Sequence, residues 1–226
     1  MASAASRFAV QSTEIIEVPV EESTSAGNYV YTAKKFCEIL IKLADEGPTI
    51  YNNTAGMNLG VWTGSAWSFD CWNLVKSIIW GFNFSKCGAL GGGVYCSHGL
   101  PDTTGWGIVS MSSDVSTSFT AADLEKMKPG EFLYKDGHAG VFMGKREGRD
   151  GYWAIECTPA GTNNVQWSHV YVGGGRNLGS PWTHHCKLPW INYAITPDNP
   201  TGTTIQVIDN SISGYEEALA ELEKKT

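Results

Sequence analysis

The order of two periodicities along the chain constrains its fold more than any other feature. Helical spacing comes first, with apolar residues at Phe36, Ile39, Leu40 and Leu43 and a similar pattern in residues 74–79. Strand patterns come later, in the segments EFLYKDGHAGVFMG, GYWAIECTP and NNVQWSHVYVG. Helices followed by strands predict an α+β domain in which N-terminal helices pack on an antiparallel β-sheet.

Capping and turn residues predict where these elements begin and end. Thr32 is an expected N-cap for the first helix, and the Gly-Pro pair at 47–48 is an expected stop. Thr120 predicts the start of a short helix that ends before Pro129, and the turn at residues 136–137 predicts a hairpin.

The chain divides by composition into three parts. Residues 29–196 carry the helix and strand patterns and form the predicted domain. Residues 1–28 are small, polar and acidic, and we interpret them as an N-terminal arm or pro-segment. Residues 197–226 form a C-terminal tail in which IQVID predicts a short strand and the capping-box spacing of Ser213 and Glu216 predicts a short helix.

Composition excludes several classes of function. The net charge is −7 and no Lys/Arg-rich run exists, so the electrostatic footprint of a nucleic-acid-binding protein is missing. No stretch approaches 18 apolar residues, so we expect no membrane span. The first residues, MASAASRFAVQSTEIIEV, lack the continuous apolar region of a secretory signal.

The six cysteines leave the redox question open. Cys87 and Cys96 could close a disulfide in the glycine-rich segment CGALGGGVYC, but without a visible secretory signal the even number is weak evidence. Cys37 and Cys186 fit the role of small buried hydrophobes.

Cys71, in SFDCWNLV, is the candidate nucleophile. Asp70 is a good N-cap residue, which places Cys71 in a first helical turn, where backbone N–H groups lower a thiol pKa. A lone cysteine on a helix is more often a buried core residue, so the interpretation depends on partners. His138 begins an apolar strand and could act as base, and Glu156 is a carboxylate in an apolar strand that could orient the imidazole.

These segments resemble a known family. SFDCWNLV, MKPGEFLYKDGHAGVFMG and WAIECTP are similar, in this order, to the nucleophile, histidine and third-residue segments of the NlpC-like and CHAP cell-wall cysteine peptidases, and especially of phage-type lysins. The resemblance covers roughly residues 29 to 193. It implies a papain-like fold with Cys71 as nucleophile, His138 as general base and then acid, and Glu156 as the orienting residue.

The resemblance also implies roles around the nucleophile, and the chain departs from the family pattern there. Tyr51 matches a tyrosine whose hydroxyl helps to stabilise the oxyanion, and Asp70 could anchor an amine of the stem peptide. Trp72 stands where relatives usually carry serine, so we expect it to contact substrate and alter specificity. Thr158 replaces an asparagine that often supplies a fourth catalytic group, which leaves that group in doubt.

The implied function is a peptidoglycan hydrolase that cuts an amide bond of the stem peptide through a thioester. A D-Glu–diamino acid endopeptidase is favoured, and an N-acetylmuramoyl-L-alanine amidase of CHAP type is the alternative. A non-catalytic cell-wall-binding protein and an acyltransferase are further alternatives. The expected partners are peptidoglycan or muropeptides, without metal or organic cofactor. We expect a monomer that acts extracellularly or at the cell wall.

Two further expectations concern the THHC segment and the two terminal segments. The segment THHCKLPW invites a metal interpretation, but adjacent histidines diverge on a strand and lack the usual ligand spacing. The arm and the tail flank the domain, and we hypothesise that one of them covers the substrate groove.

Overall fold

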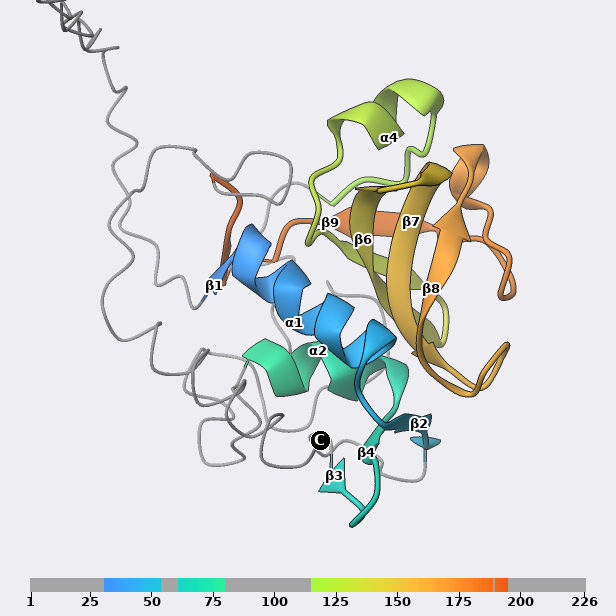
Figure 1. The fold of residues 1–226 in the computed structure, drawn as a ribbon. Coiled ribbons are helices and arrows are strands. Elements are labelled where there is room, and N and C mark those ends of the chain that lie inside the picture. The colour runs from blue at the N-terminus through green and yellow to red at the C-terminus, as the bar shows by residue number, and fades with distance from the viewer. Residues whose placement is uncertain (1–30, 54–60, 80–114, 189, 195–226) are drawn as a thin grey trace, which may run out of the picture.

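The computed structural model describes residues 31–53, 61–79, 115–188 and 190–194. Within these ranges three α-helices precede the strands of a five-stranded antiparallel sheet (Figure 1). The predicted α+β class with an antiparallel sheet is therefore confirmed.

The main sheet consists of five antiparallel strands. Its strand order is β8-β7-β6-β5-β9, and every neighbouring pair is antiparallel. The strands are β5 (Phe132–Lys135), β6 (His138–Arg146), β7 (Arg149–Thr158), β8 (Asn164–Val170) and β9 (His184–Cys186). Gly137 has a φ of 71°, which glycine adopts without strain, and it closes the β5–β6 turn. Four of these strands were predicted, and β9 adds an edge that was not.

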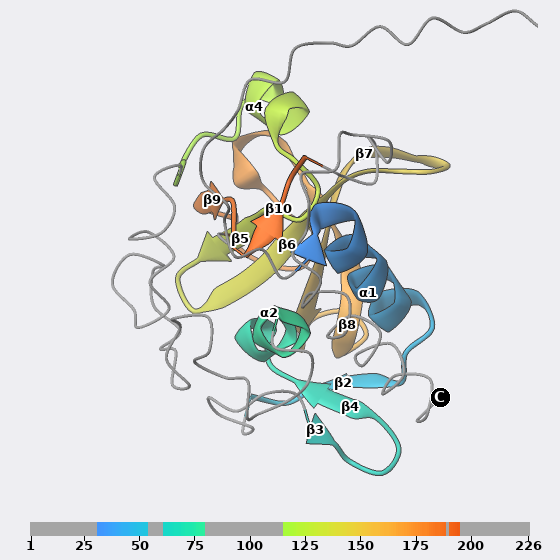
Figure 2. The same ribbon diagram turned by 90° about the vertical axis from the view of Figure 1, so that its left-hand side faces the viewer.

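Helix α1 (Ala33–Asp45) forms where its capping residues predict. The Thr32 side chain accepts a hydrogen bond from the Lys35 backbone N–H at 3.2 Å, and the helix ends at Glu46, directly before Gly47. The predicted apolar face is buried, and each such side chain contributes roughly 1.5–3 kcal/mol. Helix α2 (Cys71–Ile79) lies beside α1, and both pack on the same face of the main sheet (Figures 1 and 2).

Two small sheets complete the described part of the chain. One has the order β2-β4-β3 and lies at the opposite end of the molecule from α4 (Ala121–Lys126) in both views. Its strands are β2 (Thr49–Tyr51), β3 (Val61–Trp62) and β4 (Trp67–Phe69). The other small sheet pairs β1 (Tyr31–Thr32) with β10 (Ile191–Asn192) in parallel, which ties the two ends of the described domain together.

The two faces of the main sheet border separate cores. The face toward α1 and α2 buries Val141, Ile155 and Cys157. The opposite face buries Phe142 and Ala154, with side chains from α4 and from the loop between β8 and β9. Strand alternation explains this division, because successive residues point to opposite faces.

Several predictions lie outside the described residues. They include the N-terminal arm, the C-terminal tail with its strand and helix, and the Cys87–Cys96 pair. Among the described helices, none is long and apolar enough to cross a membrane.

Candidate active site

Cys71 is held at the first position of α2 by a local capping arrangement. The Asp70 side chain accepts two hydrogen bonds from Asn73, one from its backbone N–H at 2.7 Å and one from its amide Nδ2 at 2.8 Å. Asp70 therefore has the predicted N-cap role. Its side chain is buried, so both oxygens serve the helix rather than solvent.

His138 and Glu156 meet across the β6–β7 ladder. Val141 pairs with Ile155, so His138 and Glu156 lie on the face opposite to that pair, close enough for their side chains to touch. The His138 Nε2 atom is 2.6 Å from Glu156 Oε2, and both side chains are buried. Since a carboxylate only accepts hydrogen bonds, Nε2 carries the proton of the neutral ring and Nδ1 carries the free lone pair.

The Cys71 thiol lies beside the start of β6, the strand that begins with His138. The backbone N–H of Ala139 interacts with the Cys71 sulfur, and Ala139 directly follows His138. Within the described part of the chain, no hydrogen bond joins the Cys71 thiol to the His138 ring. Nucleophile–base hydrogen bonds are often long without substrate and tighten in the complex, so this geometry is compatible with a nucleophile–base pair.

Burial sets the protonation of the resting pair. It raises the pKa of the Cys71 thiol to about 12, with a further contribution from the Asp70 charge, and nearby backbone N–H groups oppose this only in part. Burial also lowers the pKa of His138. The backbone N–H groups lower the thiol pKa, as expected, but desolvation outweighs them, so the net shift is upward instead of downward. Thiol and imidazole are both neutral at rest.

Tyr51 lies near the nucleophile. It ends β2, which pairs in parallel with β4, so that Tyr51 is opposite Phe69, two residues before Cys71. Burial raises the pKa of Tyr51, and the nearby Cys71 adds to this effect. Its hydroxyl also hydrogen-bonds to Asn53. Strand β2 thus brings the predicted oxyanion donor into the electrostatic neighbourhood of the sulfur.

The Trp72 side chain is buried and therefore not available for a substrate contact. Its side chain is 0% exposed, and its ring packs against Phe132 and Tyr134 with centroid distances of 5.1 and 6.1 Å. This corrects the expectation of a substrate contact, since the ring fixes α2 against the sheet. The residue after Cys71 points to the core because α2 packs on the sheet along that side.

Arg176 and Trp182 join the site from the loop between β8 and β9, and the sequence did not predict either. Arg176 Nη1 donates to Glu156 Oε2 at 2.7 Å. The Trp182 ring stacks on His138, with 5.4 Å between centroids and 17° between planes. Only the unusual GGGRN run hints at a specialised loop, and its spacing does not indicate contact with Glu156.

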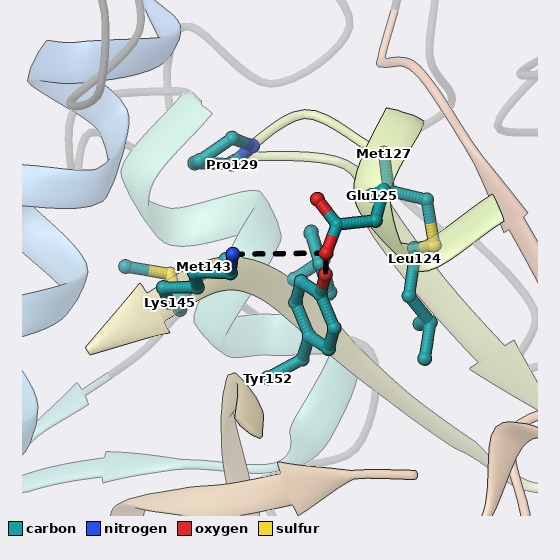
Figure 3. A pocket seen from close by; sticks show the side chains of 9 residues that line it. Leu124, Glu125, Met127, Pro129, Met143, Lys145 and Tyr152 are labelled. Atoms are coloured by element: carbon teal, nitrogen blue, oxygen red, sulfur yellow. Dashed lines mark hydrogen bonds and ion pairs between the residues drawn. The ribbon is translucent and has the colours of Figure 1, made fainter. Parts of the chain in front are cut away.

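A cavity of about 310 Å³ lies away from this group of residues. Figure 3 shows the side chains of Tyr152 and Lys145 directed at Glu125, on the rim between α4 and the sheet. Met127 and Met143 are among the apolar residues that line the cavity. The lining contains none of the candidate catalytic residues, so this cavity is a separate feature of the α4 face.

The histidines of THHC are occupied by neighbours. His185 Nδ1 is 2.9 Å from Glu131 Oε2, and His184 Nδ1 is 2.9 Å from the Thr183 hydroxyl. No group of three or more metal-binding side chains occurs among the described residues. These histidines therefore belong to the sheet edge.

No protein-family model, curated protein or solved structure matches this chain significantly. Any functional assignment therefore depends on the sequence motifs and the geometry of Cys71, His138 and Glu156.

Proposed function

We propose that this protein is a peptidoglycan hydrolase with a papain-like fold and a Cys71–His138–Glu156 catalytic group. The observation that carries the proposal is the buried 2.6 Å contact between His138 and Glu156 beside the helix N-terminus that bears Cys71. The resemblance of the three surrounding segments to cell-wall cysteine peptidases indicates the substrate class.

The proposed reaction begins from neutral groups. As the Cys71 sulfur bonds to the carbonyl carbon of the stem peptide, its proton passes to His138 Nδ1. Glu156 stabilises the imidazolium that forms, through the existing contact at Nε2. The oxyanion takes hydrogen bonds from the Cys71 backbone N–H and the Tyr51 hydroxyl.

The second half of the reaction returns the enzyme to its starting state. The carbon–nitrogen bond breaks, His138 gives its proton to the leaving amine, and a thioester remains on Cys71. His138 then takes a proton from a water molecule as the water oxygen attacks the thioester carbon. The carbon–sulfur bond breaks, and His138 returns that proton to the Cys71 sulfur. No metal or organic cofactor takes part in these steps.

The favoured bond lies between D-Glu and the diamino acid of the stem peptide. An N-acetylmuramoyl-L-alanine amidase uses the same steps on a different bond. Mass spectrometry of defined muropeptides separates the two, because the endopeptidase shortens the peptide whereas the amidase releases it whole from the sugar.

The test of the chemistry is Cys71→Ala. We expect turnover of muropeptides to fall by about 10⁴-fold or more, because the nucleophile is lost. Cys37→Ala is the matched control, since Cys37 is also a buried cysteine on a helix, and we expect it to retain full turnover. Equal fragment release by wild type and Cys71→Ala would overturn the thiol mechanism.

A non-catalytic binding protein on the same fold is the competing proposal. The observation in its favour is the protonated, buried Cys71 thiol, which has no hydrogen bond to His138 in the described structure. Binding of muropeptides by the wild type without any cleavage product would support this alternative and contradict the hydrolase.

A further inference from the structure

Arg176 reaches the catalytic group from a loop far from the motif segments. Its side chain is 4% exposed, and Nη1 donates to Glu156 Oε2 at 2.7 Å. The same oxygen contacts His138 Nε2 at 2.6 Å. The second guanidinium nitrogen, Nη2, donates to the Leu178 carbonyl at 2.8 Å. Arg176 thus clamps the carboxylate from the loop side while His138 contacts it from the sheet.

The planar guanidinium also has an aromatic partner that touches the imidazole. Arg176 lies over the Trp182 ring at 4.7 Å, and this ring stacks on His138. A buried cation is costly unless it is paired, and here the carboxylate and the ring supply the pairing. Trp182 therefore connects the arginine and the histidine by a second route besides Glu156.

The backbone around Arg176 accommodates this arrangement through glycine. A Cβ atom at Gly179 would lie 2.8 Å from Arg176 Nη2, and one at Gly174 would lie 2.2 Å from the Trp182 carbonyl oxygen. Both glycines also have positive φ angles, of 142° and 76°. The loop is therefore shaped so that Arg176 and Trp182 can approach the site.

We propose that Arg176 is a positioning residue, which holds the Glu156 carboxylate against His138 Nε2 so that Nδ1 remains available to the Cys71 thiol. This inference rests on the proposed function. The side-chain hydrogen bonds of Arg176 go to Glu156 and to the Leu178 carbonyl, and the nearby Cys71 adds only a charge interaction, so Arg176 positions the catalytic group through Glu156.

The electrostatics of His138 give a readout that a purely structural role would not change. The charged groups that act on this imidazole are Glu156 on β7, Arg176 on the loop and Lys135 on β5. After burial, the Glu156 charge raises the pKa of His138, whereas Arg176 and Lys135 lower it. Removal of Arg176 takes away one charge that lowers the pKa of His138, so this pKa rises as long as the Glu156 contact at Nε2 persists.

Arg176→Met tests the inference by removing the charge while keeping the side-chain length. We expect the His138 pKa, followed by NMR of the imidazole in the full-length protein, to rise by about one unit. We also expect kcat on muropeptides to fall about 10²-fold with little change in KM. Arg176→Lys should recover at least tenfold of that kcat, because it restores a charge beside the carboxylate.

Lys135→Met is the matched control for charge alone. Lys135 also lowers the pKa of His138, but its amine donates to the Asp136 carbonyl and does not touch Glu156. We expect a smaller rise of the His138 pKa than in Arg176→Met, and an unchanged kcat. An unchanged His138 titration in Arg176→Met, or a kcat for Arg176→Lys as low as for Arg176→Met, would overturn the inference.

A double variant keeps the inference testable where Arg176→Met folds poorly, since that variant leaves a buried carboxylate unpaired. Glu156→Gln combined with Arg176→Met carries neither charge. Because Arg176 acts through Glu156, the double variant should be as fast as Glu156→Gln alone. A further loss of more than about fivefold would contradict action through Glu156.

Failure of the inference can be distinguished from failure of the proposed function. The His138 titration requires no substrate, whereas the kcat comparison does. Wild type that leaves muropeptides intact, together with a shifted titration in Arg176→Met, refutes the hydrolase and supports the clamp. Wild type that cleaves muropeptides, together with identical titration and kcat in Arg176→Met, supports the hydrolase and refutes the clamp.

Discussion

The two faces of the main sheet use the same strands for different purposes. Toward α1 and α2, the strands present apolar side chains such as Val141 and Ile155, which are fully buried. On the opposite face, the neighbouring positions carry His138 and Glu156, with Arg176 folded over them. One strand pair therefore packs against a core on each face, and the face opposite the helices also carries His138 and Glu156.

This difference explains how a buried network of charged side chains can be held in place in so small a domain. Helix packing on the apolar face fixes β6 and β7, and their register places His138 and Glu156 in contact without a flexible connection. Cys71 then approaches from the helix face, where the Ala139 N–H meets the sulfur. The candidate catalytic group forms at the sheet end, where contributions from both faces meet.

The largest effect expected on the apolar face is on stability. Ile155→Ala removes a fully buried side chain directly next to Glu156 in sequence. We expect the free energy of unfolding to fall by about 3 kcal/mol, as measured by urea denaturation. Turnover per folded molecule should stay within about twofold of wild type, because the opposite face is untouched.

One outcome of this experiment would contradict the separation of roles between the two faces. If Ile155→Ala lowered kcat as strongly as it lowered stability, the two faces would be mechanically coupled. The separation of roles between alternate strand residues would then be wrong.

Gly140→Ala makes the corresponding perturbation on the face that carries His138 and Glu156. An added Cβ would lie 2.8 Å from Trp182 Cη2 and 3.1 Å from Cζ2, so the indole must shift away from His138. We expect a loss of about 1–3 kcal/mol in unfolding free energy and about a tenfold fall in kcat. Denaturation and muropeptide turnover measure the two effects.

Trp182→Phe supplies the control for this steric argument. Phenylalanine lacks both clashing atoms, so Gly140→Ala combined with Trp182→Phe should recover most of the lost stability. Additive losses in the double variant would show that the Gly140 effect does not pass through the Trp182 ring.

The local parts of this structure were predictable from the sequence. Thr32 and Asp70 cap their helices through hydrogen bonds that span three residues, and the β5–β6 hairpin follows from its turn. Information of this kind lies within a few residues or within one hairpin. Contact between His138 and Glu156 was a hypothesis that depended on the pairing of neighbouring strands, because the sequence does not fix their register.

The rest depended on interactions that the sequence does not encode locally. Arg176 reaches Glu156 through a loop whose path depends on several glycines, and no spacing rule predicts that path. The orientation of Trp72 follows from which side of α2 packs on the sheet. The direction of the Cys71 pKa shift was missed because desolvation is a sum over the whole fold, whereas the helix N-terminus is a local feature.

The smallest expected effect is the pH dependence of kcat/KM, which distinguishes a neutral thiol–imidazole pair from a thiolate–imidazolium pair. Because burial lowers the pKa of His138, kcat/KM should rise with pH through a midpoint below 6.5. Because burial raises the pKa of Cys71 to about 12, no second midpoint should occur near the ordinary thiol value of 9.0. Initial rates on a muropeptide between about pH 4 and pH 10 measure both limbs.

Stability should follow the same two groups with opposite signs. The folded pKa of His138 is depressed, so its contribution to stability is present above pH 6.5 and is lost as pH falls through the folded value. The folded pKa of Cys71 is raised, so its contribution is present below pH 9.0 and is lost as pH rises toward about 12. Urea denaturation across the pH range measures both changes.

Alkylation by iodoacetamide decides whether the resting pair is neutral. A protonated thiol reacts faster with every rise in pH up to at least about pH 10, whereas a thiolate–imidazolium pair reaches a plateau in acid. Free glutathione, assayed beside the protein, reports the behaviour of an unburied thiol. A plateau below pH 7 for Cys71 would mean that the backbone N–H groups at the start of α2 outweigh desolvation and hold the thiol as a thiolate.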